Sequence, residues 1–257
     1  MKAEENNPLA AVCVSYHTFL EQSSIDGKNL NFLLEKLPLL KWDSAYVLDD
    51  YRSKKENNSV LTLYARPKSC PHPTEDIWQK YEELRYAEIM QSINKADKDD
   101  AEFLEKCKAI GMPPCESPLA HITLDFTPEA VWQAYLLMQT YHIVGMRWHG
   151  GYARRTFICG SEDIERLHLF EHTRILDDRE KPGRIIREAG QKWKPSLAPA
   201  VKIEGDKAIV SHCWWDDWKG LVFVQYELRY NPVSRRIVDF KSQKEQTLYE
   251  YNCGIKY

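Results

Sequence analysis

The order of the secondary-structure patterns constrains the fold of this chain more than any other feature. Helical patterns and one hairpin pattern occupy the first half, whereas the chain from residue 200 onward is dominated by strand patterns. Helices followed by a run of strands are typical of the α+β class. In a doubly wound parallel sheet, by contrast, helices and strands alternate along the chain. We therefore expect an α+β fold: a helix-rich N-terminal part with a β-hairpin, followed by a C-terminal antiparallel β-meander packed on helices.

Two dipeptides mark where helices should begin. Asn7-Pro8 and Thr127-Pro128 each place a capping side chain directly before a proline at the first helical position. A third mark is Gly111, which stands where a glycine often ends a helix. The expected helices span residues 8–22, 29–37, 74–94, 98–110, 128–142, 161–176 and 183–189.

Alternating apolar and polar residues predict the strands. Two of them, 44–52 and 59–66, are joined by a polar stretch and should form the hairpin. In the strand over 221–230, every second residue is large and apolar, which indicates an antiparallel sheet with one buried face. The other strands are expected over residues 122–126, 152–159, 200–204, 207–215, 236–241 and 247–257.

A proline-rich segment over 112–118 is the clearest boundary in the chain. It predicts a helical part with the hairpin over 1–111 and an α+β part ending in the antiparallel sheet over 119–257. The length of 257 residues suits two small domains or one single domain.

The composition excludes several classes of protein. Aromatic residues make up 12% of the chain, which supplies too much apolar area for an intrinsically disordered protein. The formal net charge is −3, so the chain lacks the positive charge that dominates nucleic-acid binding. We expect neither a nucleic-acid partner nor a membrane partner.

The cysteines point to a reducing compartment. There are 7 of them, an odd number, and no two form a C-x-x-C pair. A disulfide framework or a zinc ribbon is therefore not expected. Buried, reduced thiols and an N-terminus without a basic start or a long apolar core together predict a cytoplasmic protein.

His168, Glu171 and His172 form the sharpest motif in the chain, H-x-x-E-H. Positions i and i+4 share one face of a helix, so the two imidazoles could hold one metal ion while Glu171 acts as a general base on metal-bound water. The alternative is a surface helix whose histidines flank the apolar Leu167 and Phe170.

This five-residue pattern resembles the inverzincin metalloprotease signature. The resemblance implies a zinc ion and a third ligand further along the chain. Possible third ligands are Glu188, Glu204 and Glu227.

Trp214, Trp215, Asp216, Asp217 and Trp218 lie between two predicted strands and form a candidate binding site at a hairpin tip. Exposed aromatic rings there could stack on a ligand or a partner side chain, and the carboxylates could accept hydrogen bonds. Strand alternation places neighbours on opposite faces, which favours a core position for at least one of Trp214 and Trp215. Trp218 is then the expected exposed ring.

Arg147 and Arg154 flank a glycine turn and form a second candidate binding site, for an anion.

His212 and Cys213 are neighbours on a predicted strand. Their side chains should point to opposite faces, so we do not expect a nucleophile–base pair.

These observations favour a non-catalytic module that binds a protein partner or a small ligand, without a cofactor, for example a cytosolic protein that neutralises a toxin or an enzyme. The alternative is a metal-dependent hydrolase that uses zinc at the H-x-x-E-H helix.

Overall fold

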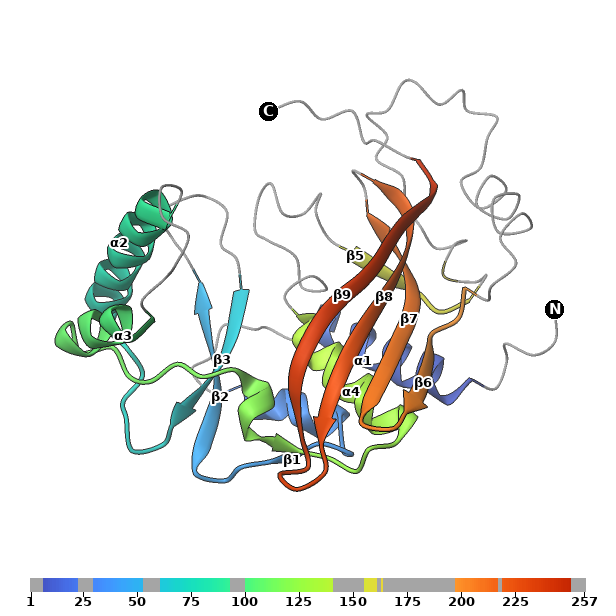
Figure 1. Cartoon of the computed structure of the whole chain (residues 1–257), viewed down its shortest axis with the longest axis horizontal. Coiled ribbons are helices and arrows are strands. Elements are labelled where there is room, and N and C mark those ends of the chain that lie inside the picture. Colours follow the sequence, from blue (N-terminus) through green and yellow to red (C-terminus); the bar gives the residue numbers. More distant parts are fainter. Residues whose placement is uncertain are drawn as a thin grey trace.

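The α+β architecture expected from the sequence is confirmed in a computed structural model. The structure describes residues 7–22, 30–52, 61–92, 100–140, 155–160, 163, 197–216 and 219–250. N-terminal helices and small two-stranded sheets come first, and a C-terminal antiparallel sheet contacts helix α4 (Figure 1).

The helices agree with the expected positions to within a few residues, except η2, which was not expected. The long segments are α-helices, and the two short ones are 3-10 helices. They are α1 (Pro8–Gln22), η1 (Asn31–Lys36), α2 (Glu75–Ser92), α3 (Asp100–Ala109), η2 (Pro118–His121) and α4 (Pro128–Met138). The helices expected over 161–176 and 183–189 fall almost wholly outside the described residues.

The helix-start and helix-end signals work as the sequence indicates. Asn7 Oδ1 accepts a hydrogen bond from the backbone N–H of Leu9 at 2.9 Å. Thr127 Oγ1 accepts one from the backbone N–H of Ala130 at 3.3 Å. Gly111 follows α3 with a φ of +79°, a left-handed conformation that glycine adopts without the steric cost of a Cβ.

The strands form three separate sheets. β2 (Tyr46–Arg52) and β3 (Leu61–Pro67) are the expected hairpin, and the short β1 (Lys41–Trp42) pairs with β4 (Ile122–Thr123). The third sheet has five strands in the order β5-β7-β8-β9, with β6 also paired to β7. Its strands are β5 (Arg155–Ile158), β6 (Ala200–Glu204), β7 (Lys207–Asp216), β8 (Gly220–Asn231) and β9 (Arg236–Tyr249).

The last strand is longer than the sequence pattern predicts. Separate strands were expected over 236–241 and 247–257, but β9 runs unbroken to Tyr249, and residues 251–257 lie outside the described residues. Register shifts against β8 leave Val238, Gln243 and Leu248 as extra residues, that is, as β-bulges. Because β9 borders only β8 among the described strands, its exposed polar middle can stay paired without being buried.

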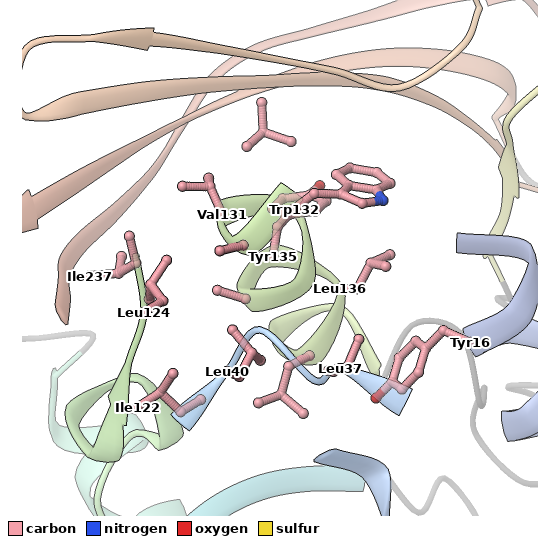
Figure 2. Packing of buried hydrophobic residues seen from close by; sticks show 14 of the residues in the cluster. Tyr16, Leu37, Leu40, Ile122, Leu124, Val131, Trp132, Tyr135, Leu136 and Ile237 are labelled. Atoms are coloured by element: carbon pink, nitrogen blue, oxygen red, sulfur yellow. The ribbon is translucent and has the colours of Figure 1, made fainter. Parts of the chain in front are cut away.

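One hydrophobic core joins the two ends of the chain. α1 contributes Tyr16, η1 contributes Leu37, and α4 contributes Trp132 and Tyr135, which lie beneath the sheet (Figure 2). From the sheet, Leu228 belongs to the same cluster. Burying one large apolar side chain stabilises a fold by about 1.5–3 kcal/mol, so the N-terminal helices are a substantial part of what supports the C-terminal sheet.

The expectation of one buried face holds for only part of this sheet. Near the β6 end, β7 alternates between buried and half-buried residues. At the β5 end the residues of both faces are buried, among them Cys213, Trp214 and Trp215 in β7 and Leu221 and Phe223 in β8.

The hairpin, α2 and α3 lie to one side of the large sheet (Figure 1). The segment 112–118, expected to be a linker, is attached to the hairpin, because Glu116 and Ala65 exchange both backbone hydrogen bonds. Among the helices that the structure describes, none has the length and apolar character needed to cross a membrane.

Candidate functional site

The described residues of the predicted binding tip are buried. Trp214 and Trp215 are 1% and 2% exposed, and Asp216 is 6% exposed. The Asp216 carboxylate accepts a hydrogen bond from the backbone N–H of Lys219 at 3.2 Å, which holds the turn between β7 and β8. Both tryptophans are therefore core residues, whereas strand alternation predicted at least one, because both faces of the sheet are covered there.

Arg155 completes this cluster, and the sequence analysis missed it in favour of its neighbour Arg154. Its guanidinium carbon lies 4.0 Å from the centroid of the Trp214 ring, and its Nε is 3.6 Å from Asp216 Oδ2. The pairing of β5 with β7, which sets Arg155 opposite Asp216, produces this contact. Predicting the contact of Arg155 with Trp214 and Asp216 would have required knowing that β5 pairs with β7. No sequence feature of β5 indicates which strand it pairs with.

The other predicted site residues lie outside the described residues, and their roles stay predictions. They are Arg147, Arg154, His168, Glu171, His172, Asp217 and Trp218. Within the part of the chain that is described, no three His, Cys, Asp or Glu side chains are grouped so as to hold a metal ion.

His212 lies in the centre of the core and is held in its neutral form. Its Nδ1 donates to the backbone carbonyl of Cys213 at 3.2 Å, so its Nε2 is the acceptor for the Tyr135 hydroxyl at 2.6 Å. Burial lowers the pKa of His212 to about 3 and raises the pKa of Cys213 to about 12. As expected from alternation, the two side chains do not form a nucleophile–base pair.

A buried charge cluster joins the hairpin to the loop before α2. The fully buried Asp49 accepts a hydrogen bond from Arg66 Nε at 2.7 Å, and its Oδ2 also lies 2.9 Å from His72 Nδ1. Tyr64 is adjacent, with a buried hydroxyl that has no hydrogen-bond partner and a pKa raised by burial and by Asp49. A carboxylate that orients a histidine supplies two of the three members of a catalytic triad. The nearby Cys115, however, is exposed, and its thiol donates to the backbone carbonyl of Pro113 at 3.4 Å.

A groove of about 580 Å³ lies between η2 and the start of β9. β9 contributes residues of both faces, such as Ile237 and Asp239, together with the bulged Val238. Since a groove on one face would touch alternate residues only, this one runs along the edge of the strand. The remaining lining residues come from η2 and its N-cap, the end of α4 and the β8–β9 turn: Ser117, Leu119, Ala120, Met138 and Ser234, with Arg236 and Phe240 from β9.

Of the two charged side chains that line this groove, Asp239 has a partner of opposite charge, whereas Arg236 has no described one. Asp239 is already neutralised, because Lys241 Nζ lies 2.7 Å from its carboxylate and the backbone N–H of Phe240 donates to it at 2.9 Å. The same contacts lower the pKa of Asp239. Arg236 is half-buried, forms no ion pair with a described carboxylate, and has a buried Nε without a hydrogen-bond partner. A buried donor left unsatisfied costs roughly 1–3 kcal/mol.

No sequence pattern pointed to this groove, because its walls come from segments more than one hundred positions apart, from Ser117 to Phe240. The chain matches no protein-family model, no curated protein and no solved structure.

Proposed function

We propose that this chain is a non-catalytic, cytosolic binding module and that the groove between η2 and β9 is its recognition site. The observation that supports the proposal is the composition of the groove wall. Leu119, Met138, Ile237 and Phe240 provide apolar contact, and Arg236 provides a cation that no described carboxylate neutralises.

The size of the groove agrees with this role. Small-molecule sites are commonly about 300–1,000 Å³, mostly apolar, and carry a few polar groups that fix the orientation of the ligand. A space of about 580 Å³ with two serine hydroxyls and one arginine in its lining fits that description. A side chain of a partner protein, as in a neutralising complex, would use the same features.

The experiment uses the full chain with its Ile, Leu, Val and Met methyl groups labelled for NMR. A panel of small amphipathic acids, bases and neutral compounds is titrated in. Ligands of the groove should shift the methyl signals of Met138, Ile237 and Val238, which line it.

A matched pair of variants separates the groove from the rest of the surface. Ser234→Trp places a large ring on the groove wall, and it should abolish the shifts. Val233→Trp changes the neighbouring position, which is 92% exposed and outside the lining, so the shifts should remain. The proposal fails if no compound shifts these methyl groups, or if Ser234→Trp leaves the shifts unchanged.

A further inference from the structure

From the groove we infer that the ligand is an amphipathic carboxylate: a compact apolar body that carries one carboxylate, which pairs with Arg236. This inference rests on the proposed function and adds the chemical class of the ligand. It follows from the position of the cation, from the state of the acid beside it and from the shape of β9.

Arg236 is the group that would recognise the carboxylate. A guanidinium presents donors in a planar fork that matches the two oxygens of a carboxylate. The Nε of Arg236 is buried without a hydrogen-bond partner, whereas its two terminal nitrogens are not buried in this way, so they are the donors that a carboxylate in the groove would meet. A ligand carboxylate would accept hydrogen bonds from this side chain without first displacing a described carboxylate.

Asp239 does not oppose this assignment, although it lines the same groove. Its carboxylate is engaged by Lys241 and by a backbone N–H. A basic ligand would have to compete with Lys241 for Asp239 and would also face Arg236. Charge complementarity therefore favours an acid over an amine.

The apolar part of the ligand follows from the remaining walls. Met138, Ile237 and Phe240 line the same groove as Arg236. An inorganic anion would leave these surfaces in water, whereas an alkyl or aryl group would bury them. The groove thus distinguishes an amphipathic acid from phosphate or sulfate.

The shape of β9 disfavours an added peptide strand as the occupant. A strand that pairs with an edge needs a regular row of backbone donors and acceptors. The bulge at Val238 interrupts that row in the middle of the groove, and a second bulge follows at Gln243. A compact ligand does not depend on this register.

The test compares three compounds that share one apolar body: 4-phenylbutyrate, 4-phenylbutanamide and 4-phenylbutylamine. Dissociation constants are measured on the full chain by NMR titration of the groove methyl groups. We expect the acid to bind about tenfold more tightly than the amide, since charge-assisted hydrogen bonds are about twice as strong as neutral ones. The amine should bind most weakly.

Two variants with the same change in net charge show whether the contact is direct. Arg236→Gln should reduce the preference for the acid over the amide to about twofold or less. Lys202→Gln removes an exposed cation of β6 that does not line the groove, and it should leave the preference intact.

The outcomes separate this inference from the proposed function. Equal binding of acid and amide, or an acid preference that survives Arg236→Gln, overturns the inference while leaving a binding groove. Absence of all shifts at the groove overturns both. A dimer of the unliganded chain that Ser234→Trp dissociates, measured by analytical ultracentrifugation, would show that a second copy fills the groove and would also overturn the inference.

Discussion

At the scale of single residues, the charges that matter most are the ones that are buried. Asp49 is fully buried and has both Arg66 and His72 as neighbours. Removing one partner of a buried ion pair leaves the other charge without compensation in a medium of low polarity. Buried charges of this kind contribute more to stability than the exposed ion pairs of α2 and α3, such as Asp76 with Lys80.

Asp49→Asn should therefore destabilise the protein by about 3–5 kcal/mol, because Arg66 would remain buried without its carboxylate. Urea unfolding followed by circular dichroism measures the change. Asp76→Asn is the matched control, since it breaks the exposed ion pair of Asp76 with Lys80 and should cost less than about 1 kcal/mol. Similar losses of stability in the two variants would contradict the view that the buried charge of Asp49 matters more than an exposed one.

His212 gives the stability a defined dependence on pH. Its pKa is about 3 in the folded protein, against an ordinary value of 6.5, because burial disfavours the charged ring. Between these values the unfolded chain binds a proton that the folded chain does not. The contribution of His212 to the free energy of unfolding is complete above pH 6.5. It declines as the pH falls, by up to about 1.4 kcal/mol per pH unit.

Urea unfolding at a series of pH values from about 7 to about 4.5 tests this dependence. Over that range the free energy of unfolding of the parent chain should fall by roughly 2 kcal/mol more than that of His212→Gln, because the variant lacks the titrating ring. The His212 ring signals of the folded parent should also stay constant in NMR spectra. Parallel stability curves would show that another group causes the loss.

These residue-scale contacts could not have been predicted from the sequence. The hairpin register places Asp49 opposite Tyr64, and a loop then brings His72 to the same carboxylate. No spacing along the chain encodes a meeting of this kind. The opposite is true of His212 and Cys213, whose separation to the two faces of β7 followed from alternation alone.

At the scale of elements, local signals predicted where helices begin. Thr127→Ala should destabilise the protein by about 1 kcal/mol, because the N-terminus of α4 would lose a cap that satisfies the backbone N–H of Ala130. Thr127→Ser keeps the hydroxyl and should retain most of the stability. Thermal unfolding of both variants measures the difference, and equal losses would show that the methyl group of Thr127 matters more than its hydroxyl.

Strand ends were harder to predict than helix starts. The polar residues from Ser242 to Gln246 suggested a break, yet all of them except the bulged Gln243 are paired to β8 within β9. Polarity marks a break only where a strand must bury a face, and an edge strand need not do so at every position. The burial of both Trp214 and Trp215 was missed for a related reason, since the covering of both faces depends on tertiary packing.

At the scale of the whole molecule, the core connects elements from the first forty residues to the C-terminal sheet. Leu9, Tyr16, Leu33 and Leu37 are buried in the same cluster as α4 and the sheet strands. Cooperative unfolding should follow from such a shared core, whatever the division suggested by the segment 112–118.

A fragment comprising residues 119–257 tests this. Without α1 and η1, the apolar face of α4 would be exposed to water, so the fragment should bind a hydrophobic dye and should unfold without a cooperative transition. The full chain, as the control, should show one transition by fluorescence and by circular dichroism. A sharp urea transition in the fragment would instead support two independent units.

The bulges of β9 also bear on how the protein behaves when it is concentrated. A long, straight edge strand is a template on which another chain can be added, which is a route to fibrils. β9 has 14 residues, but its displaced residues twist the edge, and Lys241 and Lys244 add charge to its exposed middle. The folded chain does not offer a straight template at this edge, so aggregation that depends on β9 would have to begin from chains that have already unfolded.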